Sequence, residues 1–401
     1  MLQFALGQAG LCVQSSSARS HDLQRDQRAE NDQAAASPNA PSAKLIEEAL
    51  AKGDSEAARK LVPALLVTPR VPADTLLRAG AGLAEHDLYP EAAQVFGRCT
   101  KDFSQLFECH YNLALAQLAL GQYPAALATI DTAPRTSPSG EVSRTYLRGK
   151  IETALGTNAE AERDLSAAFA AAPREENYAL DLGLFYLRVQ KYQKGLAVFK
   201  KATSLGKGSP FLQLGLGFAQ FLGGESAESI ETCRALLSGQ PDFSPARVLL
   251  AFGLYTRGRI EEAEKVAAQG LREPHPFPYL FYLHGVSLIK LGSQDPALAL
   301  GDLTVAAQAI PRCSLCYLAM SKAHERKDDR AAAIGDLEKA VIIDPGFAEA
   351  WYRLATLSEQ AGKPEEAQQA RRRFAALKES KTDRETEMLR DVFVKSLSGG
   401  P

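Results

Sequence analysis

A small residue recurs at nearly constant spacing along most of the chain, and this period limits the possible folds more than any other feature. Starting from Ala58, the members of the series are separated by 34, 34, 35, 34, 34, 34, 36, 34 and 34 residues. A repeat of this length forms one supersecondary unit, which cannot bury its apolar face alone and therefore stacks on its neighbours. The series consists of Ala58, Ala92, Ala126, Ala161, Gly195, Ser229, Ala263, Ala299, Ala333 and Ala367.

Three further markers keep the same register. A second small residue precedes members of the first series by twelve places, or by fourteen in the case of Gly285: Gly80, Ala114, Gly149, Gly183, Gly217, Ala251, Gly285, Ser321 and Ala355. Turn glycines fall between the two series at Gly53, Gly121, Gly156, Gly224, Gly258, Gly292 and Gly362. Prolines end several units, at Pro138, Pro173, Pro241, Pro311 and Pro345. The agreement of four markers predicts one repeat array.

The pattern within each unit indicates two helices. Each unit has two segments of about 12 to 14 residues with apolar residues at helical spacing, separated by the turn glycine. The two small residues would lie where the paired helices cross, because a small side chain lets the backbones approach. A bulky residue four places after the second-helix small residue would fill the remaining space, as at Phe96, Leu165, Phe199 and Leu337. We therefore predict an all-α fold built from antiparallel helix pairs.

The repeat resembles the tetratricopeptide repeat (TPR) family. The resemblance rests on segments such as Leu182-Gly183 with Tyr186, then Gly195 and Phe199, and it extends over roughly residues 39–380. It implies a right-handed superhelical solenoid with about ten repeats over residues 39–381. It also implies a non-enzymatic scaffold that binds another protein or peptide segment.

The two ends of the chain differ from the repeats. Residues 1–38 are expected to be a disordered leader, because Leu23 is the only large apolar residue between Ser15 and Ala43. A degenerate or truncated signal segment remains an alternative, because Leu2 to Val13 is mildly apolar. Residues 382–401 are expected to form a capping helix and tail. Thr382 and Glu385 resemble a capping box, and Leu389, Val392, Phe393 and Leu397 share one face of a helix expected over residues 383–397. Both a cytoplasmic and an exported or periplasmic location stay open.

Composition and motifs favour no enzyme class. The chain has 46 Lys and Arg against 48 Asp and Glu, a balance that does not favour nucleic acid as a partner. No apolar run reaches the roughly 18 residues of a membrane-spanning helix. The sequence contains no phosphate-binding glycine loop, no His-Glu-x-x-His and no Gly-x-Ser-x-Gly. We therefore expect no catalytic residue, no cofactor and no metal site.

The cysteines leave several interpretations open. Cys313 and Cys316 form a C-x-x-C that could be two small residues at a helix start, a disulfide, or a thiol redox or metal site. Cys99 and Cys109 lie at the junction of two units and would be oxidised in an exported protein. Cys233 has a core position in its helix and is expected to be a buried free thiol.

The family resemblance also predicts where a partner would bind. In this family the first helices of successive units line a concave groove, and here the groove positions are mainly apolar or aromatic. An exposed apolar stripe of this kind suits an apolar or amphipathic segment of a partner. The predicted groove residues are Leu180, Leu184, Leu187, Phe211, Leu214, Phe218, Phe221, Val248, Phe252, Tyr255, Tyr279, Tyr282, Val286 and Ile289.

Two alternatives to an open groove remain. The helices could curve so tightly that the stripe packs within the array, or the chain's own leader or tail could fill the groove. Two other functions also compete with a simple scaffold: an exported accessory factor in envelope assembly or secretion, and a module with thiol redox or metal chemistry at the C-x-x-C.

Overall fold

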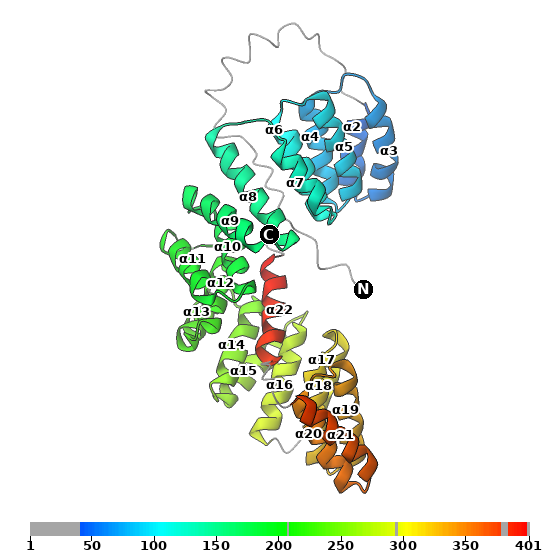
Figure 1. The fold of residues 1–401 in the computed structure, drawn as a ribbon, viewed down its shortest axis with the longest axis vertical. Coiled ribbons are helices and arrows are strands. Elements are labelled where there is room, and N and C mark those ends of the chain that lie inside the picture. The colour runs from blue at the N-terminus through cyan, green and yellow to red at the C-terminus, as the bar shows by residue number, and fades with distance from the viewer. Residues whose placement is uncertain (1–40, 207, 293–295, 378–383, 399–401) are drawn as a thin grey trace. The chain divides into compact units, whose positions relative to one another are not determined.

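The computed structural model describes residues 41–206, 208–292, 296–377 and 384–398, and these ranges contain helices but no strand (Figure 1). The 21 helices, α2 to α22, confirm the all-α prediction. The predicted leader, residues 1–38, lies outside the described residues.

Twenty of these helices follow one another as ten pairs. In the first half these are α2 (Pro41–Ala51) and α3 (Ser55–Val67), α4 (Ala73–Glu85) and α5 (Tyr89–Asp102), α6 (Phe107–Ala119) and α7 (Tyr123–Asp131), α8 (Pro138–Leu155) and α9 (Asn158–Ala171), and α10 (Glu176–Arg188) and α11 (Tyr192–Ser204). In the second half they are α12 (Pro210–Leu222) and α13 (Ser226–Gly239), α14 (Ser244–Thr256) and α15 (Ile260–Gly270), α16 (Pro278–Leu291) and α17 (Pro296–Ala309), α18 (Ser314–Arg326) and α19 (Arg330–Ile343), and α20 (Ala348–Gln360) and α21 (Pro364–Leu377).

Each pair turns at a residue in the left-handed backbone region. All seven predicted turn glycines have positive φ, for example 72° at Gly53 and 89° at Gly224. A glycine adopts this conformation without steric cost, since it has no Cβ. The three remaining turns use Asp87, Gln190 and Asp328, with φ of 60°, 60° and 55°. The turn therefore has the same geometry whether or not a glycine is present.

The helices of a pair cross closely at the predicted small residues. A Cβ added at Gly80 would lie 2.5 Å from Cε1 of Phe96, and one added at Gly149 would lie 2.9 Å from the backbone nitrogen of Leu165. Phe96 and Leu165 are buried. These contacts confirm that the small residue makes room for the bulky residue of the facing helix.

The chain divides after Phe185 into two compact units. The first unit contains α2 to α9 and most of α10. One of its apolar clusters is built from α2 to α6 around residues such as Leu76, Leu83 and Phe96. A second cluster, from α6 to α8, includes Ile130 and Leu147. Each cluster extends over more than one helix pair, as expected where neighbouring repeats bury each other's apolar faces.

The second unit contains α11 to α22. Its first helices of successive pairs contact one another, α12 with α14, α14 with α16, and α16 with α18. Phe199, Phe218 and Phe252 are among its most completely buried side chains. The contacts give the unit a continuous face made of first helices. Across the described residues, no helix combines the length and apolar character needed to cross a membrane.

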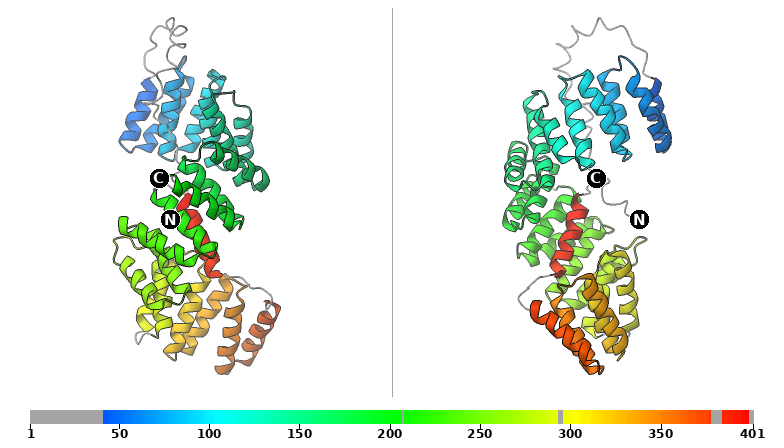
Figure 2. Two further views of the ribbon diagram at one scale, coloured as in Figure 1. Left: turned by 90° about the vertical axis from the view of Figure 1, so that its left-hand side faces the viewer. Right: turned by 45° about the vertical axis from the view of Figure 1, so that its right-hand side comes forward.

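The last helix, α22 (Arg384–Ser398), turns back along the second unit. It lies beside α14 and α16 in Figure 1, and the two views of Figure 2 show the same placement. Its bounds lie within one residue, at each end, of the helix predicted over residues 383–397. Its predicted role as a cap for the last repeat stays a prediction.

Candidate functional site

α22 is held against the face of first helices by two apolar side chains. Leu389 and Phe393 are both buried, and the ring of Phe393 stacks on that of Phe218 in α12 with 4.8 Å between centroids. Glu385, Leu389 and Phe393 are spaced four residues apart, so they lie along one side of the helix. Glu387, on another side, is exposed. α22 therefore contacts the unit with one apolar face, as a ligand helix in a groove does.

Polar contacts fix the first turn of α22. Nε of Arg384 donates to Oδ2 of Asp344 at 2.5 Å, and its Nη2 donates to the carbonyl oxygen of Gly346 at 2.5 Å. The guanidinium also lies 4.7 Å from the ring centroid of Phe347, a cation–π distance. One turn of chain between α19 and α20 thus anchors the start of α22. The next residue, Glu385, accepts a hydrogen bond of 3.2 Å from the hydroxyl of Tyr282 in α16.

Burial divides the predicted groove residues into two groups. Nine are buried: Leu180, Leu184, Leu187, Leu214, Phe218, Val248, Phe252, Tyr282 and Val286. Five are partly buried: Phe211, Phe221, Tyr255, Tyr279 and Ile289.

Two kinds of contact account for this burial where the contacts are described. Phe221 and Phe252 meet edge to face at 5.3 Å, a contact between stacked first helices within the array. Phe218 and Tyr282 instead contact α22. The predicted groove residues are thus covered partly by neighbouring first helices and partly by α22. Their role as a partner site stays a prediction.

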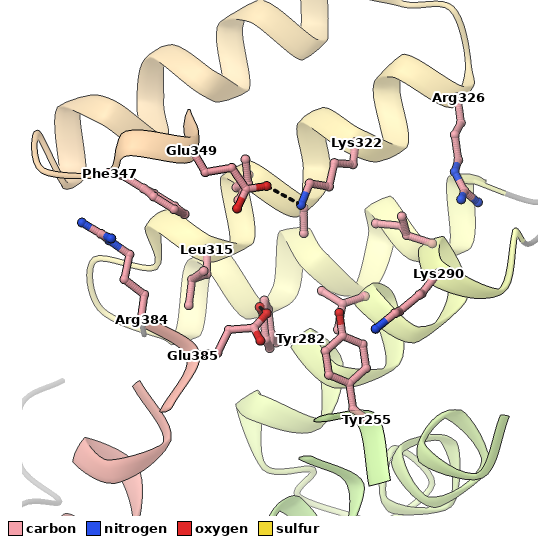
Figure 3. Close-up of a pocket in the computed structure, with 14 residues that line it drawn as sticks. Tyr255, Tyr282, Lys290, Leu315, Lys322, Arg326, Phe347, Glu349, Arg384 and Glu385 are labelled. Carbon is pink, nitrogen blue, oxygen red and sulfur yellow. Dashed lines mark hydrogen bonds and ion pairs between the residues drawn. The ribbon is translucent and has the colours of Figure 1, made fainter. Parts of the chain in front are cut away.

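An open cavity of about 580 Å³ lies next to the start of α22 (Figure 3). Its apolar wall comes from α14, α16 and α18 and from the chain before α20, and Arg384 and Glu385 of α22 close one side. The apolar and aromatic lining residues are Tyr255, Tyr282, Val286, Ile289, Leu315, Leu318, Ala319 and Phe347. Three of the predicted groove residues besides Tyr282 therefore face a space that α22 leaves open.

The rim of the cavity carries more positive than negative charge. Lys290, Lys322, Arg326 and Arg384 face two carboxylates, Glu349 and Glu385. Lys322 pairs with Glu349 at 2.9 Å. Lys290 places its Nζ 4.6 Å from the ring centroid of Tyr255. Within the described part of the chain, neither Lys290 nor Arg326 forms an ion pair, so both are available to a negatively charged group.

The two tyrosines of the cavity remain neutral donors at ordinary pH. Burial, and then the charges of Glu385 and Glu349, raise the pKa of Tyr255 to about 12. Burial, followed by the charge of Glu385, raises the pKa of Tyr282 well above its usual range. Because each phenol keeps its proton, its hydroxyl can donate to a carboxylate, as Tyr282 does to Glu385.

The C-x-x-C lies at the start of α18. Cys313 is the residue before the helix, and its sulfur accepts from the backbone nitrogen of Cys316 at 3.2 Å. The two sulfurs form a disulfide, as do those of Cys99 and Cys109. Both sulfurs of the C-x-x-C belong to buried residues, and no metal-binding group of His, Cys, Asp or Glu occurs among the described residues. Thiol redox or metal chemistry at this motif stays a prediction.

Cys233 is a buried free thiol, as expected from its position in the helix. Burial raises its pKa to about 12, although a hydrogen bond with Ser229 acts in the opposite direction. The thiol therefore stays protonated at physiological pH.

One buried histidine escaped the sequence analysis. His284 lies between two carboxylates, with Nδ1 2.5 Å from Oδ2 of Asp302 and Nε2 3.3 Å from Oε1 of Glu264. Burial lowers its pKa, but the hydrogen bonds and charges of Asp302 and Glu264 outweigh burial and raise it overall. The cluster joins α15, α16 and α17, which points to a structural tie behind the cavity wall.

Several segments of the chain match known tetratricopeptide repeats. Family models described as tetratricopeptide repeat match residues 108–132, 146–210, 244–269 and 337–369. Small glutamine-rich tetratricopeptide repeat-containing protein 2 of Saccharomyces cerevisiae is 31% identical over 80 residues. That match spans 20% of this chain and only 23% of the length of the relative.

Solved structures of repeat proteins are also similar. A tetratricopeptide repeat protein from Parabacteroides merdae is 18% identical with a TM-score of 0.48, and the match covers 63% of this chain and 98% of that one. TTC0263, a TPR protein of Thermus thermophilus, is 25% identical with a TM-score of 0.39 over 46% of this chain and 100% of that one. The family matches lie within the array of helix pairs and show that the chain contains tetratricopeptide repeats over these segments.

Proposed function

We propose that this protein-interaction scaffold binds its partner through the cavity beside α22, and that the partner inserts an apolar side chain flanked by acidic residues. TPR proteins bind other proteins, and their repeats are typically non-enzymatic. The single observation that carries the proposal is the open cavity with an aromatic wall and an excess of basic side chains at its rim.

The size and lining of the cavity suit one or two side chains of a peptide. Ligand sites are typically concave, about 300 to 1,000 Å³, and mostly apolar with a few placed polar groups. Tyr255 and Ile289 are only partly buried and can contact an inserted side chain. Tyrosines in such positions often contribute a large share of binding energy. Lys290 and Arg326 would attract nearby carboxylates of the partner and speed association.

The experiment begins with a photoreactive amino acid at Ile289 and, as a reference, at Val67, which is 81% exposed in α3. A protein cross-linked from Ile289 and not from Val67 is taken as the partner, and its affinity is measured by calorimetry. We expect Tyr255→Ala and Lys290→Glu each to weaken binding by about 1 kcal/mol or more. Val67→Ala is the matched control and should leave the affinity unchanged.

The result that would contradict the proposal is equally specific. If the partner binds both cavity variants with the affinity of the original chain, the partner site lies elsewhere on the array. The exported accessory factor and the thiol module stay predictions. The disulfides Cys99–Cys109 and Cys313–Cys316 support the exported factor, because such bonds persist mainly in oxidising compartments.

A further inference from the structure

We propose that α22 is an exchangeable internal ligand, and that the partner is an amphipathic helix with the same carboxylate, aliphatic and aromatic face, which must displace α22 to bind fully. This inference rests on the proposed function, because it names the partner class and the regulation of the same site. In α22 the face consists of Glu385, Leu389 and Phe393.

α22 differs from the helices that build the array. Helices of the array pack on both neighbours and cross at small residues, as Gly285 does against Leu303. The sequence from Arg384 to Lys395 contains no glycine, alanine or serine, so this stretch of α22 has no small residue at which another helix could cross it closely. Its described apolar contacts involve one face, through Leu389 and Phe393. It is therefore attached to the array and is not a member of it.

The seat of α22, meaning the surface around Phe218 and Tyr282 that this helix covers, is continuous with the cavity. Tyr282 contributes to both, because its hydroxyl donates to Glu385 while its ring lines the cavity. Arg384 and Glu385 are themselves part of the cavity wall. A partner helix that replaces α22 and runs along the first helices from α18 toward α12 would cover the position of Glu385 first and that of Phe393 last. The two helices cannot both stack an aromatic ring on Phe218.

Charge defines the orientation of the partner. Glu385 lies at the start of α22, near the basic rim formed by Lys290, Lys322 and Arg326, and Phe393 lies near the other end. A partner helix in the same direction would place its carboxylate at the rim and its aromatic ring on Phe218. A carboxylate in the first turn of a helix is also favoured by the helix dipole.

Covalent attachment gives α22 an advantage over any partner. Only residues 378–383 connect α21 to α22, and a short tether of this kind corresponds to an effective concentration in the millimolar range. The apparent affinity for a partner equals its intrinsic affinity multiplied by the fraction of molecules in which the seat is free. Only partners that bind the first helices more tightly than α22 does would therefore displace it.

The test uses the full-length chain and a fluorescent peptide with the sequence of residues 384–398 as the probe. Leu389→Asp combined with Phe393→Asp should release α22, because each substitution would bury a charge. We expect the peptide to bind this double variant at least about 10-fold more tightly than the original chain, which its own α22 occupies. A peptide with aspartate at the positions of Leu389 and Phe393 is the control and should bind neither protein.

A second variant keeps the test decisive if the first one unfolds. Arg384→Ala with Glu385→Gln removes the polar anchors without burying a charge, and circular dichroism shows whether each variant remains folded. Ile342→Asp, at a position 76% exposed in α19, controls for an added carboxylate in the second unit. It should bind the peptide no better than the original chain.

The two proposals are tested by separate measurements, peptide binding for the internal ligand and the effect of Tyr255→Ala for the cavity. If the peptide binds neither opened variant, or binds the original chain equally well, α22 is not an exchangeable ligand and the inference is overturned. The proposed function then still stands or falls on whether Tyr255→Ala weakens the cross-linked partner. If the peptide binds the opened variants while the partner ignores Tyr255→Ala, the internal ligand is supported and the cavity proposal fails.

Discussion

The ring of Phe393 lies on the ring of Phe218 at a centroid separation of 4.8 Å and an interplanar angle of 29°, and neither side chain is exposed to solvent. Stacked aromatic pairs add about 0.5 to 1.5 kcal/mol to the gain from burial alone. The ring of Phe218 is thus already covered by a residue of the same chain. At Phe218, a partner that displaces α22 gains only the difference in free energy between its own ring contact and that of Phe393.

Substituting Gly285 should destabilise the second unit. A Cβ at Gly285 would lie 2.8 Å from Cγ of Leu303 and 3.1 Å from the carbonyl oxygen of Ala299, so α16 and α17 would have to separate. We expect Gly285→Ala to lower the free energy of unfolding by about 1 to 3 kcal/mol. Urea denaturation followed by circular dichroism measures this change.

Gly301→Ala provides the matched control for that substitution. Gly301 lies in the interior of α17, and a Cβ there would meet no atom within 4 Å. Since alanine favours a helix over glycine by about 1 kcal/mol, this variant should be neutral or more stable. Equal losses in the two variants would mean that the helices do not cross at Gly285.

The cluster around His284 should make stability depend on pH. Its pKa is raised in the folded chain, so protonation stabilises the fold below the pKa of the unfolded state, near 6.5, and this contribution is lost as pH rises through the folded pKa. We expect His284→Gln to cost more stability at pH 5.5 than at pH 8.5. The measurement is the urea midpoint of both proteins at each pH.

An exposed histidine separates this effect from a general change in charge. His275 lies between α15 and α16 and is exposed. His275→Gln is the reference, and the pH dependence of His284→Gln is taken as the difference between the two variants. If His284→Gln behaves in the same way, the two carboxylates do not hold a protonated imidazole.

The cysteines should react in a fixed order with iodoacetamide at pH 8. Cys233 is buried and its pKa is about 12, so it should stay unmodified in the native protein and react once the chain is denatured. Without reductant, denaturation should leave the bonded pairs Cys99–Cys109 and Cys313–Cys316 unmodified. Peptide mass mapping distinguishes these sites. Modification of Cys313 or Cys316 in unreduced protein from its native source would show that the pair is reduced there.

The helix pairs and their turns could be predicted because they depend on local, periodic constraints. A glycine marks seven turns, and the period alone locates those at Asp87, Gln190 and Asp328. The sequence also carries a second periodic signal. A polar residue in the first helix often pairs with one twelve places later, as in Gln117 with Thr129, Gln220 with Thr232, and His324 with Asp336.

The seat of α22 could not be predicted in the same way. The pattern of Leu389 and Phe393 predicts an amphipathic helix with one buried face, but many apolar surfaces of the array could bury that face. The sequence likewise marks Phe218 as a groove residue without naming what covers it. The choice depends on the distance between the seat and the end of α21, which no local pattern encodes.

Hydrogen exchange in a Phe393→Ala variant would decide between a groove seat and a terminal cap for α22. Removing a buried phenylalanine ring typically costs about 3 to 5 kcal/mol, so α22 should detach far more often. If α22 occupies the groove, the segments it covers lose protection, namely α12 around Phe218 and α16 around Tyr282. The exchange of α20 and α21 should stay unchanged, because the described apolar contact of Phe393 is with α12. Leu357→Ala is the matched control, since Leu357 is buried in α20 and its loss should raise exchange in α20 and α21 while leaving α12 as it was. Faster exchange of α20 and α21 in Phe393→Ala, with α12 unaffected, would instead support α22 as the cap of the last repeat and contradict its role as an internal ligand.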